Sequence, residues 1–173
     1  SFFTGTGLIL LRFFSSMYHS FVLFDHQSLR LETKRWEGGQ AQVFYAELGE
    51  QREPVAVKIF RPEFLLSYQQ ERAVLAQSEH VSIPKLRGII EDCRGIGLVL
   101  DYVVGSTLFD ILNTAKRLKK PISIIQVCNT AWALFSVLAY VHTGMRQAVI
   151  HADISPDNIV ITPSGTLTLL DFA

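Results

Sequence analysis

The sequence predicts an α+β fold in which a small antiparallel sheet precedes a mostly helical part. Short β-branched segments separated by glycine and polar turns fill residues 29–102, and the spacing of apolar residues becomes helical after Gly105. Hydrophobic residues make up 49% of the 173-residue chain, which is enough for the core of one domain and excludes a disordered chain.

The first part of the chain predicts a sheet and one helix. Its segments alternate apolar with polar residues or are rich in valine, and glycine-containing or polar turns separate them. Strands are expected at residues 29–32, 43–46, 54–60, 86–91 and 96–102. Pro62 suits the first turn of a helix over residues 63–77, whose inner face would carry Tyr68, Glu71 and Leu75.

The second part predicts helices followed by short strands. Helical spacing begins at Leu108 and resumes in a long apolar run over residues 122–141. Three apolar segments surround a polar loop and a Pro-Ser-Gly turn, and they are expected to be strands at residues 148–150, 159–161 and 167–170. The change from strand to helix places a boundary between two lobes at residues 101–106.

Charge and cysteine content exclude several classes of function. The 16 Lys and Arg residues balance the 16 Asp and Glu residues, so no net field recruits nucleic acid and no nucleic-acid partner is expected. Cys93 and Cys128 lie far apart without metal-ligand spacing, which argues against a disulfide scaffold or a zinc site. A reducing compartment, the cytoplasm, is therefore expected.

Residues 1–28 form an apolar N-terminal extension. Arg12 and His19 interrupt it, so a transmembrane helix is not favoured, and the segment lacks the features of a signal peptide. Three interpretations stay open: a packing or interfacial segment, a gene-model artefact, or a membrane anchor. The sequence stops at Ala173 directly after an apolar strand pattern, from which we expect a fragment that is inactive on its own.

Two charged residues occupy positions where burial is costly unless they pair. Lys58 interrupts an apolar strand, and Glu71 lies on the apolar face of the expected helix with Leu75. Because each would offset the other's cost of burial, we expect a Lys58–Glu71 ion pair. A lysine on an edge strand and a surface glutamate are the purely structural alternative.

Polar residues also stand at the ends of the last short strands. Asp153 and Asn158 lie in the polar loop after His151, and Asp171 follows an apolar strand eighteen positions after Asp153. Mg²⁺ takes oxygen ligands, commonly one or two carboxylates plus phosphate oxygens, and phosphoryl transfer depends on positioning and charge neutralisation. These residues predict a site for magnesium and phosphate, whereas two polar turns capped by Asp and Asn would be the structural interpretation.

In this order the motifs resemble those of the eukaryotic-type protein kinase domain, and they are Ser/Thr-like. The motifs are Trp36-Glu-Gly38-Gly39-Gln-Ala41-Gln-Val43, Val55-Ala-Val-Lys58, Glu71, Leu98-Val-Leu-Asp-Tyr102, His151-Ala-Asp153 through Asn158, and Asp171-Phe172-Ala173. The resemblance covers residues 29–173 and implies a two-lobe fold. It implies an N-lobe over residues 29–100, a hinge over 101–105 and the first part of a C-lobe over 106–173.

The resemblance implies an ATP site, with Mg as cofactor and a protein substrate as partner. Glycines would let the loop backbone approach phosphate closely, apolar side chains would enclose the adenine, and hinge backbone groups would bond it. The implied nucleotide-binding residues are Gly38, Gly39, Ala41, Val43, Ala56, Lys58, Asp101, Val103 and Val160. Leu100 would be the gatekeeper.

The same resemblance implies roles in catalysis. Lys58 would hold the α- and β-phosphates and would be oriented by Glu71, while Asn158 and Asp171 would hold the metal. Asp153 would orient the acceptor hydroxyl and accept its proton. The side chains implied to stack between the lobes are Leu75, His151 and Phe172.

Five residues depart from the family pattern and leave three functions open. Trp36 and Ala41 replace glycines of the loop, Ala152 replaces an arginine, Ser155 replaces a lysine, and Ala173 replaces a glycine. The chain would be a Ser/Thr-type protein kinase that moves the ATP γ-phosphate to a protein hydroxyl. The alternatives are a pseudokinase acting as an ATP-binding scaffold and a kinase-like small-molecule phosphotransferase.

Overall fold

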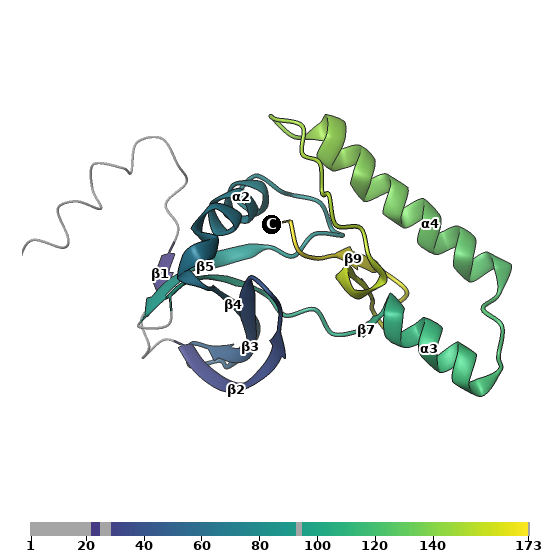
Figure 1. Cartoon of the computed structure of the whole chain (residues 1–173), viewed down its shortest axis with the longest axis horizontal. Helices are drawn as coiled ribbons and strands as arrows, with labels where there is room; N and C mark the ends of the chain where they lie inside the picture. Colours follow the sequence, from purple (N-terminus) through teal and green to yellow (C-terminus); the bar gives the residue numbers. More distant parts are fainter. Residues whose placement is uncertain (1–21, 25–28, 93–94, 173) are drawn as a thin grey trace, which may run out of the picture.

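The computed structural model describes residues 22–24, 29–92 and 95–172 (Figure 1). A curled sheet with one helix forms the first part, and two helices with a smaller sheet form the second. We call these the sheet part, which ends at residue 101, and the helical part, which starts at residue 106. The expected α+β fold is confirmed.

Six strands form the larger sheet, in the order β1-β5-β6-β4-β3-β2. The strands are β1 (Val22–Phe24), β2 (Leu29–Glu37), β3 (Ala41–Leu48), β4 (Glu53–Phe60), β5 (Leu86–Asp92) and β6 (Gly95–Asp101). All neighbours are antiparallel except β1, which pairs in parallel with β5. The register sets Lys58 opposite Val43 on one side and Leu98 on the other, so Lys58 lies in a central strand. The alternative of an edge-strand lysine is therefore wrong.

One helix packs on this sheet with the face that its spacing predicted. A short 3₁₀ turn, η1 (Pro62–Phe64), precedes α2 (Leu65–Leu75), so the α-helix begins two residues later and ends two residues earlier than expected. Pro62 opens the turn because its fixed φ suits a helix start. Tyr68, Glu71 and Leu75 are all buried, and the Tyr68 ring meets that of Phe60 edge-on at 5.7 Å.

The helical part contains two α-helices and a three-stranded sheet. Its elements are β7 (Ser106–Thr107), α3 (Leu108–Leu118), α4 (Ile124–Ala139), the π-helical turn η2 (Tyr140–Gly144), the 3₁₀ turn η3 (Pro156–Asn158), β8 (Ile159–Ile161) and β9 (Leu167–Leu169). Side chains cap both helices: Thr107 accepts from the Asp110 N–H, and Ser123 and Gln126 form a capping box. These caps fix where α3 and α4 begin.

Among the described residues, one expected strand is absent, and one strand forms that was not expected. Residues 148–150 form no strand: the Val149 N–H donates to the Val141 carbonyl, and Ile150 is 82% exposed. Three apolar residues form a strand only where a partner strand lies beside them. In the other direction, β1 lies inside residues 1–28, so part of the assumed extension belongs to the sheet; residues 1–21 and 25–28 of that extension lie outside the described residues.

The two parts share one core and are linked at a second place besides the chain connection. Residues 102–105 connect β6 to β7 without helix or strand. Away from this connection, the Glu79 N–H donates to the Tyr140 hydroxyl at 3.0 Å, and the Leu169 N–H donates to the Ser82 carbonyl at 2.8 Å. Buried residues from both parts then form a continuous cluster: Phe60, Tyr68, Leu75, Leu98, Val137, Val141, Ile159, Leu169 and Phe172 belong to it.

Helix α4 is apolar on both sides but buries only one of them. Val137 is fully buried, whereas Ile125, Trp132 and Phe135 are exposed, Trp132 by 79%. The helical segment Ile124–Gly144 is long and apolar enough to cross a membrane. Length and composition are the only criteria here, and the core helices of soluble proteins also meet them. The exposed side is a large apolar surface of the kind that associates with other surfaces.

Candidate active site

Lys58 and Glu71 form the buried ion pair that the sequence predicted. Lys58 Nζ lies 2.6 Å from Glu71 Oε2, and the two residues are 8% and 2% exposed. Burial raises the pKa of Glu71, while the positive charge of Lys58 opposes this shift. The strand β4 and the helix α2 thus hold a charged pair at the inner edge of the sheet part.

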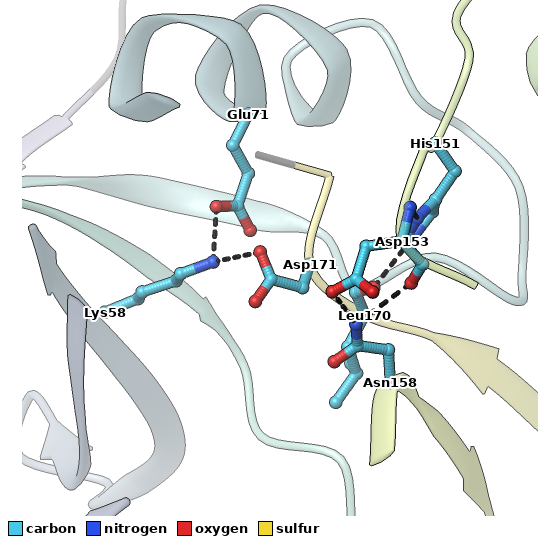
Figure 2. A network of polar contacts seen from close by, with 7 residues as sticks. All are labelled: Lys58, Glu71, His151, Asp153, Asn158, Leu170 and Asp171. Atoms are coloured by element: carbon cyan, nitrogen blue, oxygen red, sulfur yellow. Dashed lines mark hydrogen bonds and ion pairs between the residues drawn. The ribbon is translucent and has the colours of Figure 1, made fainter. Parts of the chain in front are cut away.

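Asp171 joins this pair from the other end of the chain. Lys58 Nζ lies 2.7 Å from Asp171 Oδ1, although the residues are 113 positions apart (Figure 2). The Asp171 backbone has a φ of 63°, in the left-handed region, and the next residue, Phe172, is buried in the core. Because Phe172 anchors the backbone, the carboxylate side chain of Asp171, which is 42% exposed, turns toward Lys58.

A second polar group lies beside the first. Asn158 Nδ2 donates to Asp153 Oδ2 at 2.9 Å and to the Asp153 carbonyl at 3.1 Å. His151 Nε2 lies 2.9 Å from the Leu170 carbonyl oxygen, to which it donates, and the Asp153 N–H donates to His151 Nδ1 at 3.4 Å. Figure 2 shows these residues next to Asp171, so loop 151–158 and the end of β9 face the same space.

Backbone bonds tie the two polar groups together. The Leu170 N–H donates to the Asn158 carbonyl at 2.8 Å, so the residue before Asp171 is bonded to both ends of loop 151–158. The rings of His151 and Phe172 lie 4.7 Å apart, and Leu75 belongs to the same core cluster as Phe172. The three residues expected to stack between the lobes are all buried.

A glycine turn connects β2 to β3 beside Lys58. The Gly38 N–H donates to the Ala41 carbonyl at 3.0 Å, which closes the turn. A side chain at Gly39 would meet no atom within 4 Å, so this glycine leaves open space rather than relieving a clash. Arg61 Nη2 lies 3.4 Å from Glu37 Oε1 and holds the first residue of the turn.

Apolar side chains and the chain connection complete the surroundings. Val43 lies opposite Lys58, Ala56 lies opposite Leu100, and Val160 is buried in β8. The Asp101 N–H donates to the Lys85 carbonyl and its side chain pairs with Arg87, so neither the N–H nor Oδ1 is free for a ligand. Val103 lies in the connection itself.

Comparison with known proteins agrees with this geometry. The protein kinase domain family matches residues 33–173. The chain belongs to the protein kinase family. It is 33% identical over 124 residues to Aurora/IPL1-related protein kinase 2 of Caenorhabditis elegans, covering 68% of this chain and 38% of that protein.

Other relatives include both serine/threonine and tyrosine kinases. CBL-interacting serine/threonine-protein kinase 3 of Arabidopsis thaliana is 28% identical over 142 residues, covering 79% of this chain and 31% of that protein. The tyrosine-protein kinase transforming protein Fps of Fujinami sarcoma virus is 28% identical over 171 residues, covering 96% of this chain and 19% of that protein. The chain spans less than two fifths of each of these relatives, and it carries part of the kinase fold: the N-lobe and the first part of the C-lobe.

The kinase residues present here fit a magnesium nucleotide. Asp171 bonds Lys58 through Oδ1, which leaves Oδ2 for a cation, and Asn158 uses its Nδ2 for Asp153, which leaves its amide oxygen. Among the described residues, no group of three or more His, Cys, Asp and Glu side chains could hold a metal. A magnesium ion at Asp171 and Asn158 would therefore take its other ligands from water and phosphate oxygens, as Mg²⁺ bound with nucleotides does.

The structure brings two further residues to the kinase site that the sequence did not assign to it. A Cβ at Gly105 would lie 2.5 Å from the Ile161 carbonyl oxygen and 2.7 Å from Val160 Cγ1, so only glycine lets the chain pass this close to β8. Ser82 holds β9 through its carbonyl. A glycine at the change from strand to helix, such as Gly105, can indicate that two backbone segments pass close together. The bond that the Ser82 carbonyl accepts from Leu169 leaves no pattern in the sequence.

Proposed function

We propose that the protein is an ATP-dependent Ser/Thr-type protein kinase that transfers the γ-phosphate to a protein hydroxyl with Mg²⁺. The observation that carries this proposal is the position of Lys58 Nζ between the carboxylates of Glu71 and Asp171, 2.6 and 2.7 Å away. A buried cation held by two carboxylates, one of them facing the open side of the site, is an arrangement suited to binding phosphate next to a metal.

Each residue has a defined task in this proposal. Lys58 binds phosphate oxygens, and Glu71 keeps the ammonium group from turning away. Asp171 and Asn158 hold Mg²⁺, which when bound neutralises the negative charge of the phosphates. Asp153, fixed by the Asn158 amide at 2.9 Å, orients the acceptor hydroxyl and accepts its proton.

The acceptor is the least constrained part of the proposal. Ser155 stands where many Ser/Thr kinases have a lysine near the γ-phosphate. Kinase-like enzymes that phosphorylate small molecules also lack this lysine. A small-molecule phosphotransferase and an ATP-binding scaffold are therefore the competing outcomes of one experiment.

The experiment uses the full-length protein with Mg·ATP and three acceptors: Ser/Thr peptides, Tyr peptides and a panel of small hydroxyl compounds. Asp153→Asn is expected to keep nucleotide binding in a thermal-shift titration and to lower transfer by about a hundred-fold or more. Asp157→Asn is the matched control, because Asp157 is an exposed carboxylate of the same loop to which the proposal gives no task.

Three results decide between the functions. Transfer to Ser/Thr peptides that Asp153→Asn abolishes and Asp157→Asn retains supports the proposal. Nucleotide binding without transfer to any acceptor would show an ATP-binding scaffold. Transfer only to small hydroxyl compounds would show a metabolite kinase.

A further inference from the structure

A groove lined with apolar side chains lies in the helical part, apart from the Lys58 site. It has a volume of about 450 Å³ and runs between α3, α4 and the turn from β8 to β9. It is lined by Ile111 and Leu112 of α3, Val127 of α4, and Leu167, with Ile122 two residues before α4. The polar residues of the candidate active site do not line it: Lys58, Glu71, Asp153, Asn158 and Asp171 are all outside this groove.

The groove continues toward the hinge. A second hollow of about 430 Å³ shares Ile111 and Ile161 with the first and reaches Val104 and Pro163. Leu112 is 42% exposed, and Val127 is also exposed, so apolar side chains face solvent along the groove. Together the two adjoining hollows offer an apolar surface to several side chains of a peptide segment.

Four basic residues stand in the sequence just before Ile122, one of the residues that line this groove. Lys116 and Arg117 lie in the last turn of α3, and Lys119 and Lys120 follow it, just before Ile122. All four are exposed, and none takes part in an ion pair within the part of the chain that the structure describes.

This cluster is more than the capping of a helix. Basic residues in the last turn complement the helix dipole, which accounts for Lys116 and Arg117 but not for the two lysines beyond the helix end. The only acidic residue of α3, Asp110, is at the opposite end of the helix and is bonded to Thr107 at 2.8 Å. The basic end of the groove therefore has unpaired positive charge.

We propose that this groove binds a peptide segment of a partner protein in which apolar residues are followed by acidic ones. The apolar residues lie between α3 and α4, and the acidic residues meet Lys119 and Lys120. Complementary charge at one end fixes the direction of the segment, and the apolar groove supplies most of the buried area. The surface recruits a partner independently of phosphate transfer, so the proposal stands or falls separately from the enzyme activity.

The test measures binding of a fluorescein-labelled peptide with several leucines followed by several glutamates to the full chain by fluorescence anisotropy. Replacing Lys119 and Lys120 together by glutamate is expected to weaken binding about ten-fold and to reduce its dependence on salt. Leu112→Gln is expected to weaken it by a similar factor, because Leu112 lines the groove.

Matched controls separate the groove from general effects. Arg146→Glu changes an exposed basic residue outside the cluster, and Phe109→Gln changes an exposed apolar residue of α3 that does not line the groove. Both are expected to bind the peptide as the unchanged protein does. Circular dichroism confirms that all four variants are folded.

Three outcomes would overturn the proposal. The first is no binding of the glutamate peptide, or equal binding of the same peptide with lysines in place of the glutamates. The second is equal weakening by the groove variants and their controls. The third is a mass that doubles with protein concentration and returns to that of one chain in Leu112→Gln, which would show that a second copy fills the groove.

Discussion

Replacing Lys58 with methionine would leave the Glu71 carboxylate in the core without its closest positive charge. Methionine keeps most of the apolar stem, so the main change is electrostatic. Removing one partner of a buried ion pair costs about 3–5 kcal/mol. The substitution also removes the ion pair between Lys58 and Asp171. The Asp171 side chain is 42% exposed, so this pair contributes little to stability. We expect Lys58→Met to lower the free energy of unfolding by about 3 kcal/mol near neutral pH.

The cost of this substitution depends on pH. Burial already raises the pKa of Glu71 above its ordinary 4.5, and Lys58 is the largest influence that lowers it. Without Lys58 the pKa of Glu71 rises further, helped by the nearby charge of Asp171. A carboxyl with a higher pKa in the folded state binds more protons when folded, so stability falls as the pH rises from about 4.5 through the folded pKa. Over this pH range Lys58→Met therefore loses more stability than the unchanged protein does. The extra loss is about 1.4 kcal/mol for each further unit by which the pKa of Glu71 is raised.

Urea unfolding at about pH 5 and about pH 8, with a chelator and without nucleotide, measures this difference. The double variant Lys58→Met/Glu71→Gln removes the titrating group, so its stability is expected to lose the pH dependence that Glu71 causes. At the higher pH it should exceed the single variant by about 2 kcal/mol. Parallel pH slopes for the unchanged protein and Lys58→Met would refute the reasoning, as would a double variant no more stable than the single one.

Three further predictions concern packing and backbone. Ala152 has a φ of 62°, so Ala152→Gly is expected to raise the free energy of unfolding by about 0.5–1 kcal/mol in urea titrations; a decrease would contradict the strain. Gly105→Ala is expected to lower it by about 1–3 kcal/mol because its Cβ would lie 2.5 Å from the Ile161 carbonyl oxygen, and an unchanged midpoint would show that the chain shifts freely there. Replacing Trp132 and Phe135 together by serine is expected to reduce self-association of the chain in size-exclusion chromatography with light scattering, whereas an unchanged elution profile would mean that this face of α4 is not the sticky surface.

The Lys58–Glu71 pair could be predicted because each residue alone would be costly where the sequence puts it. A lysine in an apolar strand and a glutamate on an apolar helix face offset each other, and the structure places their charged atoms 2.6 Å apart. Asp171 was different. No local pattern links residues 113 positions apart, so its place beside Lys58 followed from the order of the motifs in the family and not from spacing.

The strand errors have one physical cause. Strand composition is local, but a strand exists only where another backbone supplies hydrogen bonds. Residues 148–150 have the composition of a strand but form none, because no other described strand pairs with them. Residues 22–24 pair with β5, which lies more than 60 positions further along the chain, so no local sequence pattern predicts this pairing. Ser82 could not be predicted for the same reason, because its backbone carbonyl, and not its side chain, accepts the bond from Leu169.

The sheet part and the helical part meet at three places besides their shared core. Residues 102–105 join them through the chain, residues 79–82 join them through bonds to Tyr140 and Leu169, and Lys58 joins them through its ion pair with Asp171. With these three attachments, one part turns against the other only where a link opens. The ion pair is the link that opens most readily, because the Asp171 side chain is 42% exposed and exposed ion pairs contribute little to stability. An anion that drew Lys58 away from Asp171 would therefore loosen the contact between the two parts, while the buried Lys58–Glu71 pair could stay in place.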